Sequence, residues 1–384
     1  MRLGLEAMEA ACADFGHPER AFDAIHVAGT NGKGSTAAML ESIARRAGQR
    51  TGLATSPHLC RFAERIRVDG EPIPDSLLTQ TLEDVLRRAP ELSFFEAATL
   101  AAFVAFREAK VEIAIVEVGI GGRLDATNVI PPPRAAAITR IAFDHTDRLG
   151  DTLEAIAREK AGILKPGVHC VLGPLTPEVE AVIRARAREV GATVAFATPR
   201  DVMPGLAGAH QRSNACVAWD AASLAGFSDD TCRAGIERAT WPGRLETVRT
   251  SDGEVLLDAA HNPDGVTALA AHLDEHLRGR KVALVFGALS DKAWPSMLDL
   301  LAPRASACVY VRPPANAGLR PAADPEVLAA RHPGEVATSI TDALERARAA
   351  VGPGGVLVVT GSIFLVGEAR GTLLGLPRDP AVAL

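Results

Sequence analysis

A glycine-rich segment that carries one lysine and three hydroxyl side chains, residues 29–36, has the composition of a phosphate-binding loop. An apolar run precedes it and a helical pattern follows. Glycines let backbone N–H groups curl around an anion, and the next helix adds the positive end of its dipole. Lys33 can reach the outer phosphates of a nucleotide triphosphate, and Ser35 or Thr36 can hold Mg²⁺. The first gap is shorter than in the usual motif, and a glycine separates lysine from hydroxyls; the alternative is a glycine-rich turn without a ligand.

An acidic residue and a histidine accompany two later apolar runs. Glu117 lies in the run at 113–118, where a carboxylate is costly to bury without a cation or hydrogen-bond donors. Mg²⁺ would supply that cation, and an ion pair with Arg123 is the alternative. His145 comes after the run at 135–141 and is either a neutral metal ligand or a core histidine.

Three further residues depend more on their context. Lys160 lies near the apolar face of a helical pattern, and the pattern alone predicts a surface charge. Asp258 closes a predicted strand, where a carboxylate can hold ribose hydroxyls. Asn262 and Pro263 follow it, and they equally suit the start of a helix. Arg244 could reach a phosphate across an interdomain cleft.

Short apolar runs alternate with longer amphipathic stretches along the whole chain. This order predicts βα units and a mainly parallel sheet, with sites at the carboxyl ends of the strands. Proline and glycine at 241–244 favour a boundary. We expect an α/β fold: a P-loop ATPase domain over residues 1–241, a hinge at 242–246 and a smaller Rossmann-like α/β domain over 247–384. The predicted strands are residues 25–28, 113–118, 135–141, 168–172, 194–197, 255–258, 282–286, 307–311 and 356–359.

Length and composition narrow the class of protein. The chain has 384 residues, which favours two domains, and its 47% hydrophobic and 23% charged residues are typical of globular proteins. A net charge of −6 argues against a nucleic-acid binder. The six cysteines form no C-x-x-C pair, which makes a zinc site unlikely and indicates a reduced, cytoplasmic setting. Neither a signal peptide nor a membrane span is expected.

Taken together and in order, the motifs resemble folylpolyglutamate synthase and dihydrofolate synthase, members of the Mur-ligase superfamily. The resemblance spans roughly residues 3–365, and residues 26–35 and 121–128 are its most specific parts. Ala7 stands where the family usually has an arginine. The remaining matching segments are residues 56–59, 64–67, 95–96, 144–145, 158–163, 242–244 and 261–263.

The resemblance implies a set of site residues, with residues 247–384 as a glutamate ligase domain. Its cofactors would be ATP, two Mg²⁺ ions and a carbamylated Lys160, a lysine that CO₂ has turned into a carboxylate. Ser35 would hold one Mg²⁺, whereas Ser56, Glu117 and His145 would hold the second. The catalytic residues would be Lys33, Glu117, His145 and Lys160. The ATP-binding residues would be Gly29, Thr30, Asn31, Gly32, Lys33, Gly34, Ser35, Thr36, Asn214, Arg244, Asp258 and His261. The acceptor would contact Leu3, Gly4, Leu5, Phe95, Glu96, Leu124, Asp125 and Ala126.

The implied reaction joins L-glutamate to a carboxylate through an acyl phosphate, at the expense of ATP. We expect a monomer that acts on both dihydropteroate and reduced folates, without nucleic-acid or membrane partners. Four alternatives stay open: polyglutamate synthesis alone, a cell-wall Mur ligase, a P-loop NTPase switch and a non-catalytic nucleotide-binding scaffold. The sequence leaves the choice between one activity and two undecided.

Overall fold

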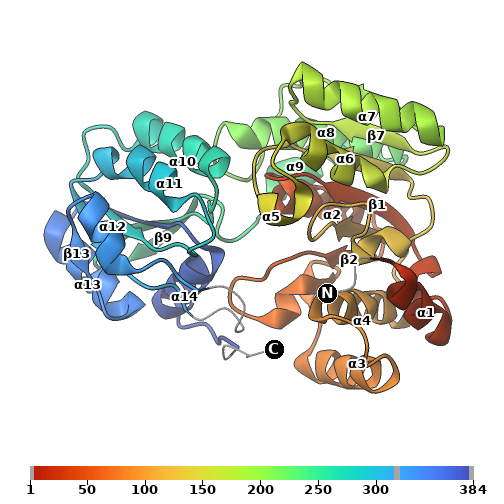
Figure 1. Ribbon diagram of the computed structural model, residues 1–384, viewed down its shortest axis with the longest axis horizontal. Helices are drawn as coiled ribbons and strands as arrows, with labels where there is room; N and C mark the ends of the chain where they lie inside the picture. Colours follow the sequence, from red (N-terminus) through yellow and green to blue (C-terminus); the bar gives the residue numbers. More distant parts are fainter. Residues whose placement is uncertain (1–3, 315–320, 380–384) are drawn as a thin grey trace. The chain divides into compact units, whose positions relative to one another are not determined.

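The computed structural model describes residues 4–314 and 321–379 and has a mixed α/β fold with two mainly parallel sheets, as predicted (Figure 1). The chain divides into two compact units. Unit 1 comprises Met1–Pro57, Ala63–Leu206 and His210–Thr240, and unit 2 comprises His58–Phe62, Ala207–Ala209 and Trp241–Leu384. Within the described residues, no helix is both long and apolar enough to cross a membrane.

Unit 1 is built around eight strands. They are β1 (Asp23–Ala28), β2 (Thr51–Ala54), β3 (Ile66–Val68), β4 (Glu71–Pro72), β5 (Ile113–Glu117), β6 (Ala135–Ile138), β7 (His169–Leu172) and β8 (Thr193–Phe196). Their order in the sheet is β4-β3-β2-β5-β1-β6-β7-β8. The six strands β2, β5, β1, β6, β7 and β8 pair in parallel with their neighbours in this order. Strands β3 and β4 add an antiparallel edge next to β2. Strands β2, β3 and β4 were not predicted from the sequence, because all three are short and none is a continuous apolar run.

Helices cover both faces of this sheet, as a parallel sheet requires. The central helix is α2, which follows β1 directly and is buried along most of its length between the sheet and two later helices, α8 and α9. This burial fits the small side chains of the helix, which are Ser35, Thr36, Ala37, Ala38, Ser42 and Ala44. The helices of unit 1 are α1 (Glu6–Asp14), α2 (Lys33–Arg46), α3 (Asp75–Arg88), α4 (Phe94–Glu108), α5 (Thr146–Leu149), α6 (Leu153–Lys160), α7 (Pro177–Val190), α8 (His210–Leu224) and α9 (Asp229–Arg238).

Unit 2 has a six-stranded sheet with apolar side chains on both faces. Successive residues of a strand point to opposite faces, so Val255 and Leu257 join one core cluster and Leu256 joins the other. Helices α10 (Pro263–His276), α11 (Trp294–Leu301) and α12 (Pro325–Arg331) cover one face, and α13 (Ile340–Val351) and α14 (Ile363–Leu374) the other (Figure 1). The strands are β9 (Glu246–Thr250), β10 (Gly253–Leu257), β11 (Val282–Phe286), β12 (Ala307–Tyr310), β13 (Glu335–Val336) and β14 (Val356–Thr360), in the order β13-β12-β11-β14-β10-β9.

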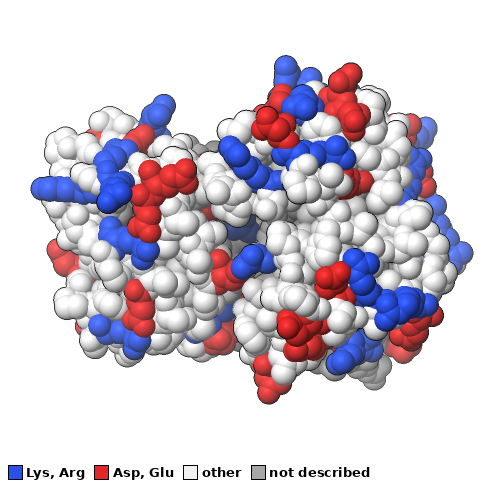
Figure 2. Space-filling view, turned by 90° about the horizontal axis from the view of Figure 1, so that it is seen from above, with Lys and Arg blue, Asp and Glu red and all other residues white. Residues whose placement is uncertain are grey.

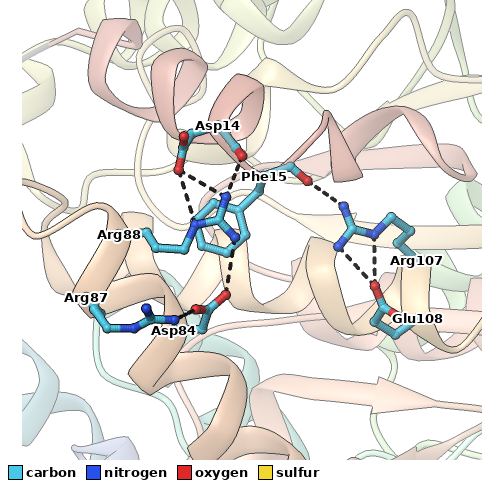
Figure 3. A network of polar contacts seen from close by, with 7 residues as sticks. All are labelled: Asp14, Phe15, Asp84, Arg87, Arg88, Arg107 and Glu108. Carbon is cyan, nitrogen blue, oxygen red and sulfur yellow. Dashed lines mark hydrogen bonds and ion pairs between the residues drawn. The ribbon is translucent and has the colours of Figure 1, made fainter.

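Charges of both signs are interspersed over the face shown in Figure 2, and Lys and Arg form no single continuous surface there. One local network nevertheless has a clear structural role, because it fixes helix α1 (Figure 3). The Arg88 guanidinium of α3 lies 3.8 Å from the centre of the Phe15 ring. It also donates to the Asp14 carboxylate at 3.1 and 3.2 Å and to the Asp14 carbonyl at 2.5 Å. Arg107 of α4 donates to the Phe15 carbonyl at 2.5 Å.

Replacing Arg88 with methionine is expected to lower the free energy of unfolding by about 1 kcal/mol or somewhat more, because a cation–π contact and a charge-assisted bond to a helix end are lost together. A urea titration monitored by circular dichroism measures the change. The control is Arg87→Met, since Arg87 is exposed and bonds Asp84 on its own helix. Equal midpoints for the two variants would contradict a special role for Arg88.

Candidate functional site

The predicted phosphate-loop and metal-binding residues lie at or after the ends of four strands that are side by side, β2, β5, β1 and β6. The phosphate-loop segment follows β1, Ser56 comes two residues after β2, and Glu117 ends β5. Val27 of β1 pairs with Glu117 in register, so the loop and the carboxylate leave the sheet at the same level. The carboxyl ends of parallel strands share one edge of the sheet. That edge is therefore the candidate site.

Two glycines give the loop its shape. Gly29 has a φ of +147° and Gly32 a φ of +89°, values that favour glycine. A Cβ atom on Gly29 would lie 1.8 Å from Thr139 Oγ1, and one on Gly32 would lie 2.4 Å from Asn214 Oδ1. Both positions therefore exclude a side chain, and the backbone stays open toward the start of α2.

Residues after β6 hold the loop from the side. The Arg140 carbonyl accepts hydrogen bonds from the N–H groups of Thr30 and Asn31 at 2.7 and 3.3 Å. Thr139 Oγ1 donates to the Asn31 carbonyl at 2.8 Å. Thr139 was not among the predicted site residues, and the predicted strand ran to residue 141, whereas β6 ends at Ile138 because the chain turns there to hold the loop. A polar residue directly after the apolar run was the available signal.

The cation and hydroxyls of the motif lie at the beginning of α2. Lys33 Nζ donates to the Thr30 carbonyl at 3.1 Å, which folds the lysine back over the loop. Ser35 Oγ accepts from Gln211 Nε2 at 3.2 Å, and Gln211 Oε1 accepts from Asn214 Nδ2 at 2.9 Å. Thr36 Oγ1 is buried and has no hydrogen-bond partner among the described residues. A buried hydroxyl without a partner beside a second hydroxyl fits an oxygen site for a divalent cation.

Lys160, at the end of α6, is buried, with 4% of its surface exposed. The expectation of a surface lysine, drawn from the helical pattern alone, is therefore wrong. Its Nζ donates to the carbonyl of Gly29, the first residue of the phosphate loop, at 2.8 Å. Burial and, next, the charge of Lys33 lower the pKa of Lys160 to about 7, although Asp144 and Asp125 act in the opposite direction. Much of this lysine is thus a neutral amine near neutral pH.

Glu117 is also buried, at 6% exposure, and its Oε2 accepts from the Ser56 N–H at 3.4 Å. The alternative ion pair with Arg123 is wrong, because Arg123 bonds Glu159 at 2.9 and 3.1 Å. Arg65, which belongs to the matching segment 64–67 but was given no role in the predicted site, is close enough for the Glu117 charge to act on it. Burial lowers the pKa of Arg65 to about 10, and the Glu117 charge partly offsets that effect. The carboxylate thus has the Ser56 segment and a partly exposed arginine as neighbours.

His145 lies in the segment that leaves β6, in the left-handed region with a φ of 50°. Its N–H donates to Asp144 Oδ1 at 2.9 Å, which steadies the turn before α5. Among the described residues, no three His, Cys, Asp or Glu side chains gather as a metal site. The predicted set of Ser35, Ser56, Glu117 and His145 relies on hydroxyls for half of its members, so it stays a prediction.

The predicted acceptor residues differ in how the structure holds them. Asp125 is fixed in a buried network with Thr127, and the ring of Phe95 packs against Gly119, where a Cβ would lie 2.4 Å from Phe95 Cζ. Glu96 has a structural task, since it forms a capping box with Ser93 at the start of α4. The spacing of these two residues already had that signature. Of the others, Ala126 is buried, Gly4, Leu5 and Leu124 are partly exposed, and Leu3 lies outside the described residues.

Unit 2 carries Arg244, Asp258 and His261 of the predicted nucleotide set. The Asp258 carboxylate accepts from the N–H groups of Leu245 and Ala260 at 2.9 and 3.0 Å and so holds the turn that presents Arg244. His261 Nδ1 donates to the Ala259 carbonyl at 2.9 Å. Asn262 caps α10 by accepting from the Gly265 N–H, with Pro263 as the first helical residue, so the alternative of a helix start at these two residues is the one that the structure shows. The nucleotide contacts of this unit stay predictions.

Comparison with known proteins gives consistent matches along the chain. The Mur ligase middle domain matches residues 27–171, and the Mur ligase glutamate ligase domain matches residues 243–363. A dihydrofolate synthase/folylpolyglutamate synthase of Bacillus subtilis is 38% identical over 341 residues, which are 78% of this chain and 79% of that protein.

Two solved structures extend the similarity to the fold. E. coli FolC in complex with DHPP and ADP has a TM-score of 0.87 at 31% identity, covering 98% of this chain and 95% of that one. The bifunctional folylpolyglutamate synthase/dihydrofolate synthase of Yersinia pestis, complexed with AMPPNP and a Mn ion, also has a TM-score of 0.87 at 31% identity. This match covers 97% of this chain and 94% of the Yersinia pestis chain.

Proposed function

The chain belongs to the dihydrofolate synthase/folylpolyglutamate synthase family of Mur ligases, and from this premise we propose that it joins L-glutamate to dihydropteroate and to reduced folates. As a member of this family it is an ATP-dependent, amide-forming ligase. The proposal gives it both activities, because the relatives from Bacillus subtilis and Mycobacterium tuberculosis, which match 78% and 95% of this chain, carry both in their names, whereas a relative from Lacticaseibacillus casei that matches 94% is named only a folylpolyglutamate synthase. Gly4 and Leu5, next to α1, would contact the dihydropteroate acceptor.

One observation carries the proposal: two lysines bond neighbouring carbonyls of the loop after β1, Lys33 that of Thr30 and the buried Lys160 that of Gly29. Phosphoryl transfer depends mainly on positioning and on charge neutralisation, with little covalent work for the protein. In the proposed first step, the acceptor carboxylate attacks the γ-phosphorus of ATP and ADP leaves. The glutamate amine then attacks the acyl phosphate carbonyl, and phosphate is released.

The residues of unit 1 have separate tasks in this scheme. Lys33 stabilises the negative charge that develops on the phosphate oxygens. Ser35, Ser56, Glu117 and His145 would hold divalent cations, which when bound neutralise phosphate charge and orient the reacting groups. Lys160 would be carbamylated, with its remaining N–H still able to donate to the Gly29 carbonyl.

Glu117→Gln and His145→Ala are each expected to lower turnover by about a hundredfold or more and to raise the Mg²⁺ concentration needed for half-maximal rate. Glutamine keeps the shape of Glu117 but removes the charge that a cation needs. Initial rates over a Mg²⁺ titration provide the measurement, and Glu108→Gln, on the exposed end of α4, is the matched control. Mg²⁺ curves that overlay the wild type for both site variants would rule out a shared metal site.

The test of the proposed function offers purified protein ATP, Mg²⁺ and L-glutamate with each acceptor in a separate reaction, and resolves products by mass. We expect one added glutamate on dihydropteroate and at least one on a reduced folate monoglutamate. Product from the folate alone would reduce the proposal to polyglutamate synthesis. Phosphate release that requires neither acceptor nor glutamate would instead support a P-loop NTPase switch.

A further inference from the structure

A buried histidine interrupts the apolar strand that leads to the phosphate loop. His26 of β1 is fully buried, and so are its neighbours Ile25 and Val27. Burial, and next the charge of Lys165, lower the pKa of His26 to about 3, so the imidazole is neutral. A neutral imidazole has one N–H donor and one bare nitrogen acceptor, and burial makes each costly to leave unpaired.

The partner of this imidazole is Thr127, which is 101 positions further along the chain. His26 Nε2 lies 2.9 Å from Thr127 Oγ1. The same hydroxyl donates its single hydrogen to Asp125 Oδ1 at 2.5 Å. Thr127 Oγ1 must therefore accept from His26, which places the imidazole proton on Nε2. Nδ1 is then a bare acceptor, buried and without a partner among the described residues.

The Asp125 carboxylate connects Thr127 to the loop that follows β5. Its Oδ1 accepts the Thr127 N–H at 3.0 Å, and its Oδ2 accepts the Ile120 N–H at 2.9 Å. One carboxylate thus ties the two ends of residues 120–127 together. The chain of hydrogen bonds runs from His26 through Thr127 and Asp125 to Ile120, so it links the strand of the phosphate loop to the predicted acceptor loop.

We propose that His26 and Thr127 are positioning residues for the acceptor, because they fix the Asp125 carboxylate and residues 120–127, which include the predicted acceptor contacts at 124–126. This inference rests on the proposed function, which supplies the acceptor. Neither residue needs to touch the substrate. The hydrogen bond from the ring nitrogen to the Thr127 hydroxyl gives the histidine a task at a position where an apolar residue would pack at lower cost.

The test compares Thr127→Val, Thr127→Ser and the double variant His26→Leu/Thr127→Val in the ligation assay and in urea unfolding. Valine keeps the shape of threonine but removes the hydroxyl, so the buried His26 N–H loses its acceptor. We therefore expect a lower urea midpoint of unfolding and weaker binding of the acceptor. We expect the KM for dihydropteroate to rise about threefold to tenfold and the KM for ATP to stay within about twofold, as for one lost hydrogen bond. Serine should restore both properties.

The double variant separates positioning from packing. Removing both polar partners should recover much of the unfolding midpoint, while the KM for dihydropteroate should stay raised. A KM that recovers together with stability, or a wild-type KM in Thr127→Val, would overturn the inference and leave the proposed function intact. Wild-type protein that ligates neither acceptor would overturn the proposed function and this inference with it.

Discussion

Replacing Lys33 with alanine is expected to abolish ATP-dependent ligation while leaving the fold intact. The ammonium lies over the phosphate loop, where it donates to the Thr30 carbonyl. Losing a cation that stabilises transition-state charge in a desolvated site raises the barrier by about 3 kcal/mol or more, which is at least about a hundredfold in rate. Initial rates of acceptor-dependent phosphate release measure the loss, and circular dichroism checks the fold.

A second effect of Lys33→Ala concerns the pKa of Lys160. The positive charge of Lys33 helps to lower the pKa of Lys160, so its removal should raise that pKa and leave less neutral amine at a given pH. Lys33→Arg is the matched control, because it keeps the charge but changes the group that meets the phosphates. Near-wild-type turnover of Lys33→Ala would contradict the assignment of residues 29–36 as a phosphate loop.

The phosphate loop could be predicted because its information is local. Two positive-φ glycines, a lysine and the first turn of α2 are consecutive in the chain, and their chemistry does not depend on distant partners. The alternation of strands and helices could also be predicted, and it indicated the α/β class and the edge of the sheet where the site lies. The exact last residue of a strand was harder to predict, as at β6, where Thr139 leaves the sheet to bond Asn31.

Features that depend on distant partners were harder to predict. Strand β2 is only the segment Thr51–Ala54, and it becomes a strand through its pairing with β5 and β3. The position of Ser56 next to Glu117 follows from that pairing. The bond between His26 and Thr127 joins residues far apart in sequence, and the one local signal was a polar residue inside an apolar strand.

Lys160 shows most clearly how packing overrides a local pattern. Residues four before and three after it, Ile156 and Ile163, are buried on the same side of the chain. Helical periodicity therefore placed Lys160 near the apolar face, but a charged residue there is usually solvated. Its contact with the Gly29 carbonyl could be found only once α6 and the phosphate loop were brought together.

Lys160 is expected to be carbamylated in the folded protein. The neutral amine attacks CO₂, the new N–C bond forms, and one proton leaves, so that R–NH₂ and CO₂ become R–NH–COO⁻ and H⁺. Because the pKa of Lys160 is lowered to about 7, the reactive neutral form predominates above that pH and is lost as the pH falls through it. Activity and carbamate content should therefore both decline below about pH 7, and added bicarbonate should oppose the decline.

Labelling with ¹³C-bicarbonate and NMR detects the carbamate directly. We expect one carbamate resonance in the wild type, none in Lys160→Ala, and a weaker one in Lys33→Ala than in Lys33→Arg at the same pH. Lys160→Ala should lack ligase activity, because an anion next to Lys33 is missing, and short carboxylates should partly restore it by occupying the space of the carbamate. A wild type that keeps full activity in CO₂-free buffer without the resonance would show that the bare amine suffices.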